Sequence, residues 1–230
     1  MDGVASTPFS VVAVRPEKVV KTAAVFVHGL WLTGAESMLL RRRVAASHGF
    51  ACHSFTYRTV GSSVQPVLAK LAEFVSRIDA DRVHFVGHSL GGIVLHRYFE
   101  AAKDLPPGRV VFLGSPTVKS KTAERVGRLP VFRSMVGRMV TEELVQPTGA
   151  REWRCDRELG CIAGTRSVGL GRFFARFDED CDGTIGVSET KLPGHTAHVT
   201  LPVSHMGMLL SAEVARQVGA FLDRGRFDVD

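Results

Sequence analysis

The sequence predicts an α/β protein with a mostly parallel central sheet flanked by helices. Short apolar runs that are typical of buried strands alternate along the chain with segments whose apolar residues recur at helical spacing. Parallel strands need such helical crossovers, because a tight turn joins only antiparallel neighbours. The chain has 230 residues, so we expect a single domain over residues 1–230.

In the first half of the chain, strands are expected at residues 10–14, 23–27, 51–57 and 82–86. Helical spacing covers residues 35–47, which end at His48-Gly49, and residues 65–78, where Pro66 suits a first turn. In the second half, a helix at 90–102 precedes a strand at 109–113. Residues 115–150 break the alternation and are expected to form a small helical cap insertion. After them we expect strands at 160–164 and 197–203 and a final helix from about Met208 to Leu222.

Composition narrows the class of protein. The chain is 45% hydrophobic and 23% charged, no apolar run reaches the ~20 residues of a membrane span, and no secretory signal is visible, so a cytoplasmic protein is expected. Its four cysteines form no C-x-x-C pair and are expected to be free thiols. The net charge is +6, with basic clusters at residues 41–43 and 119–138. These clusters indicate either a solvated face or a site for an acidic acyl carrier protein or an anionic lipid surface, and no nucleic-acid module accompanies them.

Gly87-His88-Ser89-Leu90-Gly91 fits the pattern G-x-S-x-G between an expected strand and an expected helix. Glycines two residues either side of the serine permit a tight, strained turn that raises the Ser89 hydroxyl above the sheet edge. The N–H of Leu90, at the helix N-terminus, then points toward a developing oxyanion. Ser89 is therefore the predicted nucleophile, and the alternative is a glycine-rich turn with an incidental serine.

A serine hydroxyl is a weak nucleophile and needs a positioned base. His205 follows the last expected strand and precedes the final helix, and it is the predicted base. His88 is expected to pack or hydrogen-bond locally. The other competing histidines are His28, His84, His96, His195 and His198.

These residues resemble the α/β-hydrolase superfamily, especially its compact bacterial esterases and lipases. The likeness follows element order over nearly the whole chain, and it is most specific at the Ser89 turn, at residues 28–30 and at residues 204–209. It implies the chain order serine, acid, histidine, with the acid in the loop after the strand at 160–164. It also points to the N–H of Leu30 as a second oxyanion donor, against the alternative of a plain turn.

Asp182, which Gly183 follows, fits the implied acid. Its task would be to hold the tautomer of His205 and to stabilise the imidazolium. Asp178, Asp180 and Glu189 are close enough in sequence to be rivals.

The same segment has a second interpretation, because Asp178, Asp180, Asp182-Gly183 and Glu189 match the spacing of an EF-hand calcium loop. The context argues against it: the loop is unpaired, and a proline and a glycine at 193–194 block a long exit helix. One carboxylate does not easily ligate calcium and also orient His205. We therefore predict no metal site, with calcium binding as the alternative.

Trp31, Leu32 and Met206 flank the predicted catalytic residues in sequence and are candidate residues of an acyl pocket. The expected function is hydrolysis of carboxylic esters with small to medium acyl chains, through an acyl-enzyme on Ser89 and without a cofactor. An acyl thioesterase or an esterase acting on the methyl ester of an acyl carrier protein is a close variant. An inactive hydrolase-like binding protein is the alternative from another class.

Overall fold

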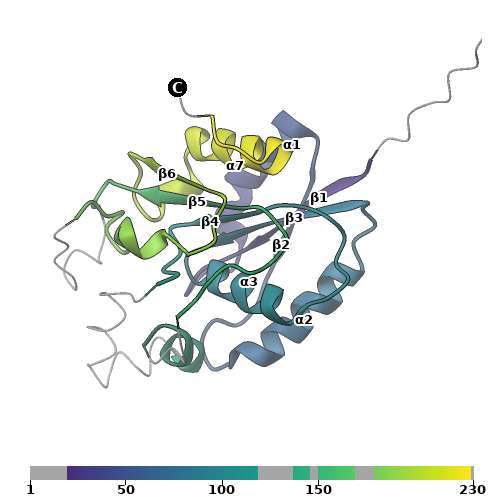
Figure 1. Cartoon of the computed structure of the whole chain (residues 1–230), viewed down its shortest axis with the longest axis horizontal. Helices are drawn as coiled ribbons and strands as arrows, with labels where there is room; N and C mark the ends of the chain where they lie inside the picture. The colour runs from purple at the N-terminus through teal and green to yellow at the C-terminus, as the bar shows by residue number, and fades with distance from the viewer. Residues whose placement is uncertain (1–19, 119–136, 146–149, 169–178, 229–230) are drawn as a thin grey trace, which may run out of the picture.

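The computed structural model describes residues 20–118, 137–145, 150–168 and 179–228, and its centre is one parallel sheet (Figure 1). Within the described residues the sheet has six strands in the order β2-β1-β3-β4-β5-β6, and all five neighbouring pairs are parallel, which confirms the predicted fold class. The strands are β1 (Thr22–Val27), β2 (Ala51–Phe55), β3 (Arg82–His88), β4 (Val110–Leu113), β5 (Leu159–Gly164) and β6 (Ala197–Leu201).

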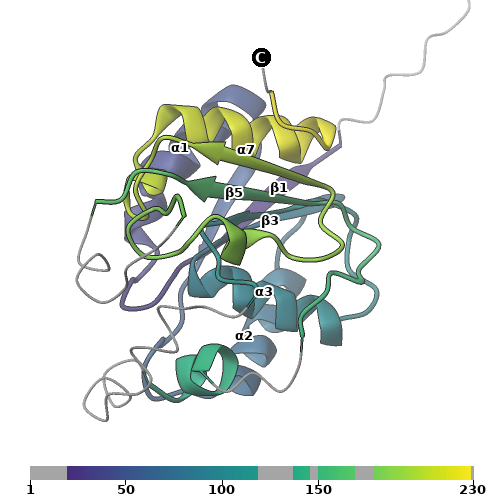
Figure 2. The same ribbon diagram turned by 60° about the vertical axis from the view of Figure 1, so that its left-hand side comes forward.

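Helices cover both faces of this sheet. The helices α1 (Met38–His48) and α7 (Ala212–Arg224) pack against each other on one face, and α2 (Val64–Ser76) and α3 (Leu90–Ala101) pack together on the other (Figure 2). None of the helices in the described ranges is long and apolar enough to cross a membrane.

The strand alternation produces two separate cores. Successive side chains of a strand point to opposite faces of the sheet. On β1, Val25 belongs to the apolar cluster that contains Ile93 of α3, whereas its neighbour Phe26 belongs to the cluster that contains Phe221 of α7. All four side chains are at most 3% exposed, so this central strand is buried on both faces.

The final helix begins later than the sequence indicates. The predicted start at Met208 is wrong, because residues Gly207–Leu209 form a short 3-10 turn, η4, and α7 starts at Ala212. The Ser211 hydroxyl accepts a hydrogen bond from the N–H of Val214 at 3.3 Å, which caps the helix at that point.

Two predicted features lie wholly or largely outside the described residues. The strand expected at 10–14 is one of them, and the cap insertion at 115–150 is the other. Within the insertion, residues 137–140 are helical and lead into η2 (Thr141–Val145), a short π-helical segment. Glu143 of η2 joins Arg97 of α3 at 2.7 Å, so this part of the insertion is tied to the α2/α3 side of the molecule.

The sheet order also locates the candidate site. From β1 the chain moves outward to β2 and then returns to the other side of β1 as β3. In open parallel sheets of this kind, the loops at the carboxyl ends of the strands diverge at such a switch point and leave a crevice. The turns after β1 and β3 lie at this switch point, and they contain the candidate residues Leu30 and Ser89.

Candidate active site

Ser89 sits on a strained turn between β3 and α3. Its backbone torsions are φ 54° and ψ −120°, a conformation that a non-glycine residue adopts only where surrounding structure enforces it. The Ser89 N–H donates to the carbonyl of Leu113 at 2.9 Å, which ties the turn to β4. A Cβ at Gly91 would lie 2.1 Å from the carbonyl oxygen of Val27, so the glycine lets α3 start directly against β1. These constraints hold the serine at the carboxyl edge of the sheet.

His205 and Asp182 form a buried hydrogen-bonded pair. The Nδ1–H of His205 donates to Oδ2 of Asp182 at 2.6 Å, and the two residues are 9% and 1% exposed. Oδ1 of Asp182 accepts from the N–H groups of Thr184 at 2.8 Å and Ile185 at 2.7 Å. The His205 N–H also donates to the Asp182 carbonyl at 2.9 Å. The carboxylate is therefore fixed on one side by its own loop, and it directs the histidine with the other oxygen.

Gly114, at the end of β4, makes room for this pair. It has φ +53°, and a Cβ there would lie 2.8 Å from Oδ2 of Asp182 and 3.1 Å from Nδ1 of His205. Sequence reasoning missed this residue. The signal in the sequence was a glycine directly after a buried strand, at the same carboxyl edge as the Ser89 turn.

The rivals of Asp182 are placed differently. Asp180 is exposed, and its carbonyl accepts from the N–H of Val187. Glu189 is buried in η3 (Ser188–Thr190), where its carbonyl accepts from the N–H of Thr117, and Asp178 lies outside the described residues. Both oxygens of Asp182 are occupied by hydrogen bonds within the protein. In the described ranges no three His, Cys, Asp or Glu side chains are grouped as metal ligands would be.

His88 connects the Ser89 turn with His205. The rings of the two histidines lie 4.8 Å apart between centroids, and Nε2 of His88 donates to the His205 carbonyl at 3.1 Å. In the described part of the chain, no hydrogen bond joins the Ser89 hydroxyl to the His205 ring. Catalytic hydrogen bonds often tighten only in the complex with substrate.

Two of the competing histidines, His28 and His84, have structural surroundings. His28 stacks on Tyr57 at 4.4 Å, its Nδ1 donates to the Gly29 carbonyl, and burial lowers its pKa. His84 accepts the N–H of Arg109, and burial together with nearby arginines lowers its pKa to about 3. These rings are neutral members of the protein interior.

The two candidate oxyanion donors come from the start of α3 and from the turn after β1. Leu90 is the first residue of α3, so its N–H lies outside the helix's own hydrogen bonding. Leu30 follows Gly29, and a Cβ at Gly29 would lie 3.0 Å from the Cβ of Ser89, so the turn after β1 touches the serine. The next N–H, that of Trp31, donates to the Thr59 hydroxyl at 3.1 Å.

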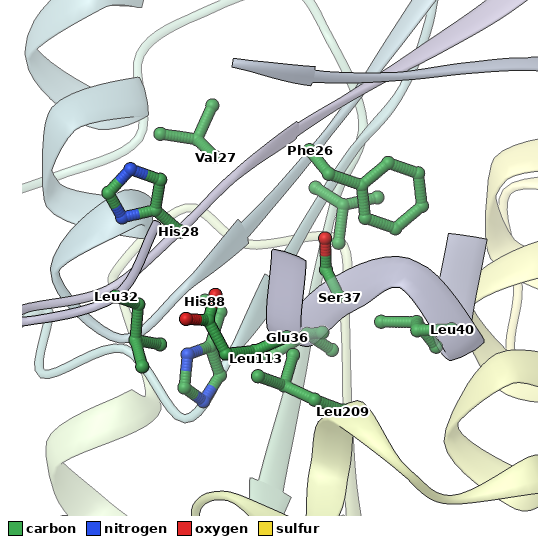
Figure 3. Close-up of a pocket in the computed structure, with 11 residues that line it drawn as sticks. Phe26, Val27, His28, Leu32, Glu36, Ser37, Leu40, His88, Leu113 and Leu209 are labelled. Carbon is green, nitrogen blue, oxygen red and sulfur yellow. The ribbon is translucent and has the colours of Figure 1, made fainter. Parts of the chain in front are cut away.

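The candidate pocket residues divide into two groups. Trp31 and Met206 are 56% and 45% exposed at this edge of the sheet. Leu32 is half-buried and lines an internal cavity of about 10 Å³ beside Glu36 and His88 (Figure 3). That volume is at the lower limit for one water molecule and is far below the several hundred Å³ of a typical ligand pocket.

A larger cavity of about 600 Å³ lies at the other end of the strands. Its lining includes Arg82, which begins β3, together with His84 and Arg157. Ser89 follows the opposite end of the same strand, about 20 Å away at the usual rise per residue. This cavity is therefore not part of the candidate active site.

The basic cluster at residues 41–43 is less available than its composition indicates. Arg41 donates to the Ser37 hydroxyl at 3.1 Å, and Arg43 donates to the Leu210 carbonyl. Arg42 is exposed. Most of the second basic cluster, at 119–138, lies outside the described residues.

A parallel sheet with a strained serine between a strand and a helix, followed along the chain by a paired aspartate and histidine, defines the α/β-hydrolase class of fold. The model of the alpha/beta hydrolase family matches residues 24–202, and the chain belongs to this family.

Solved structures agree on the fold. The mature form of lipase BlEst2 from Bacillus licheniformis superposes with a TM-score of 0.64 at 16% identity, over 91% of this chain and 94% of the other. A lipase-esterase related protein from Clostridium acetobutylicum gives 0.60 at 14% identity, over 88% and 95%. A pyrethroid hydrolase from Sphingobium faniae gives 0.58 at 15%, over 88% and 98%. No curated protein is similar enough in sequence to count as a match.

Proposed function

We propose that this protein hydrolyses carboxylic esters of small to medium acyl chains, with Ser89 as nucleophile, His205 as general base and Asp182 as its orienting acid. The observation that carries the proposal is the buried His205–Asp182 pair beside the strained turn that presents Ser89. Membership of the family and the lipase and esterase structures that share the fold support ester hydrolysis as the reaction class.

The hydrogen bond to Asp182 places the proton of neutral His205 on Nδ1, which leaves Nε2 as the acceptor. Nε2 takes the proton of the Ser89 hydroxyl as its oxygen attacks the ester carbonyl. The resulting imidazolium is stabilised by the Asp182 carboxylate, and the N–H groups of Leu30 and Leu90 stabilise the oxyanion. His205 then gives its proton to the departing alkoxide, and an alcohol and an acyl-enzyme result.

Water completes the reaction. His205 removes a proton from a water molecule as it attacks the acyl-enzyme, and it returns that proton to the Ser89 oxygen when the acid leaves. This sequence of steps requires no cofactor. An acyl thioester would react at the same residues, with a thiol as leaving group.

The test combines covalent labelling with turnover. Wild type should react with a fluorophosphonate probe at Ser89, identified by mass spectrometry of the labelled peptide, and should turn over p-nitrophenyl esters. Ser89→Ala should lose both, whereas Ser76→Ala on the exposed end of α2 should keep both. Absence of labelling and of turnover in folded wild type would overturn the proposal in favour of a binding protein.

Acyl length and leaving group are determined in the same assay. A p-nitrophenyl series from acetate to dodecanoate should show a maximum at short or medium chains. A parallel series of acyl thioesters, with and without an acidic acyl carrier protein as the thiol component, tests that variant. Assays with and without anionic vesicles test the predicted lipid surface.

A further inference from the structure

His88, the residue before the proposed nucleophile, is buried and contacts the proposed base. It is 4% exposed at the end of β3, its ring lies 4.8 Å from that of His205, and its Nε2 donates to the His205 carbonyl at 3.1 Å. We propose that His88 is a positioning residue, whose hydrogen bond to the main chain of His205 fixes the loop that presents the His205 ring to Ser89. This inference rests on the proposed function of Ser89 and His205.

The hydrogen bonds around His205 show what His88 adds. The ring Nδ1–H and the main-chain N–H of His205 both donate to Asp182, at 2.6 and 2.9 Å. These bonds fix His205 relative to the acid loop but not relative to the serine. The bond from His88 joins the same residue to the end of β3, one position before Ser89. It therefore sets the distance between the base and the nucleophile.

The protonation state of His88 suits this task. A carbonyl oxygen accepts at Nε2, so Nε2 carries the proton. Burial, together with the neighbouring His205, lowers the pKa of His88 to about 3, so the ring remains neutral when His205 becomes an imidazolium. A neutral neighbour avoids the repulsion that a second cation would exert on that intermediate.

The surroundings of the other ring nitrogen, Nδ1, support a role for His88 in hydrogen bonding through Nε2. In the described part of the chain, Nδ1 of His88 is buried and has no hydrogen-bond partner. Leaving a buried acceptor unpaired is unfavourable, and an apolar side chain of similar size would avoid this cost while filling the same space. The bond at Nε2 to His205 is the contact that such a side chain could not make.

Three substitutions separate hydrogen bonding from packing. In His88→Gln, the amide N–H₂ lies close to the position of Nε2 and still reaches the His205 carbonyl. His88→Phe keeps the ring and removes the donor, and His88→Asn keeps a polar group that is too short to reach. With the p-nitrophenyl ester preferred by wild type, we expect kcat to fall by about 10- to 100-fold in the Phe and Asn variants, with KM within about twofold. The Gln variant should recover most of the loss.

A second readout does not depend on activity. The far-downfield proton resonance of a histidine Nδ1–H bonded to a carboxylate reports the His205–Asp182 pair directly. It should remain sharp in wild type and His88→Gln, and it should broaden or disappear in His88→Phe and His88→Asn as the loop becomes mobile. Thermal unfolding shows which variants are folded. If His88→Phe does not fold, His88→Asn is the variant that tests the loss of the hydrogen bond.

The outcomes are distinct. A folded Phe or Asn variant with unchanged kcat and an unchanged resonance would overturn the positioning role, as would equal losses in all three variants. If wild type shows neither labelling nor turnover, the proposed function fails, and the resonance alone then decides whether His88 holds His205.

Discussion

Replacing Asp182 with asparagine tests the arrangement most directly, because the two oxygens of this carboxylate have different partners. Oδ1 accepts from the N–H groups of Thr184 and Ile185, at 2.8 and 2.7 Å, and Oδ2 accepts from Nδ1 of His205 at 2.6 Å. Asparagine has the same shape but only one acceptor oxygen. It must therefore either keep its oxygen on the two N–H groups or turn it toward the histidine.

The energetic balance favours the first orientation. Turning the amide would aim its N–H₂ at two N–H donors, each left unpaired at about 1–3 kcal/mol. In the favoured orientation the oxygen stays on the two N–H groups, and the amide N–H₂ faces His205. Nδ1 of His205 must then accept a hydrogen bond, so Nε2 carries the proton and is unable to receive one from Ser89. We expect kcat to fall about 10⁴-fold, or about 5.5 kcal/mol of transition-state stabilisation.

The assay is turnover of the preferred p-nitrophenyl ester, with thermal unfolding to show that Asp182→Asn is folded. Asp180→Asn is the matched control, since Asp180 is exposed in the same loop, and it should keep wild-type kcat. A folded Asp182→Asn variant within about tenfold of wild type would refute the assignment, because a wrong tautomer cannot support such a rate. A large loss in Asp180→Asn instead would transfer the role to the rival acid.

Three further predictions concern the oxyanion donor, the packing around the acid and the pH dependence of stability. Leu30→Pro removes one backbone donor and should lower kcat by about 10²- to 10³-fold with little change in KM; retained kcat in the folded variant would argue against this donor. Gly114→Ala places a methyl group 2.8 Å from Oδ2 of Asp182, at a backbone φ of +53°, and should abolish turnover. Gly49→Ala is the control, because Gly49 has a similar φ of +69° but no atom within 4 Å of the added methyl group. It should lower the free energy of unfolding in urea by only about 1–2 kcal/mol and leave turnover unchanged. Equal effects of the two alanines on turnover would contradict the close contact. Burial lowers the pKa of His84 from its ordinary value of 6.5 to about 3. Between these two pH values the His84 side chain therefore binds a proton in the unfolded chain but not in the folded chain. The free energy of unfolding should therefore fall as the pH drops from about 6.5 toward 3, by up to about 1.4 kcal/mol per pH unit from this group. In His84→Asn, whose oxygen still accepts the Arg109 N–H, the slope measured between pH 7 and pH 5 should be shallower, and parallel slopes would contradict the assignment.

The parallel sheet and the Ser89 turn could be predicted from the sequence because their signals are local. Periodicity located the described strands and the helices α1, α2 and α3 to within a few residues. The G-x-S-x-G pattern between a strand and a helix requires one backbone geometry, and the structure has it. The final helix was misplaced because Met208 and Leu209 continue the apolar spacing, while the Ser211 cap determines where the helix begins.

What the sequence could not provide were contacts between distant segments. One example is the contact of His205 with Gly114 and His88. It forms only because β3, β4 and β6 have their carboxyl ends at the same edge of the sheet, where the loop after β6 contains His205. The charge of residues 41–43 likewise does not show which side chains form hydrogen bonds within the protein. In the structure Arg41 and Arg43 do so. The resemblance to the α/β-hydrolase superfamily implied an acid after the strand at 160–164, which left Asp182 in a short group of candidates. The hydrogen bond to His205 distinguishes it from the described rivals.

The packing of α7 against α1 has a consequence for how the chain reaches its folded state. The apolar face of the sheet that includes Phe26 is closed by Phe221 and its neighbours, which are almost two hundred residues further along the chain. During synthesis that face must wait for α7, so its side chains remain in contact with water or with folding helpers until residues 212–224 have left the ribosome. We expect chains that end before Ala212 to aggregate rather than to form a smaller working protein, even though every proposed catalytic group precedes that point.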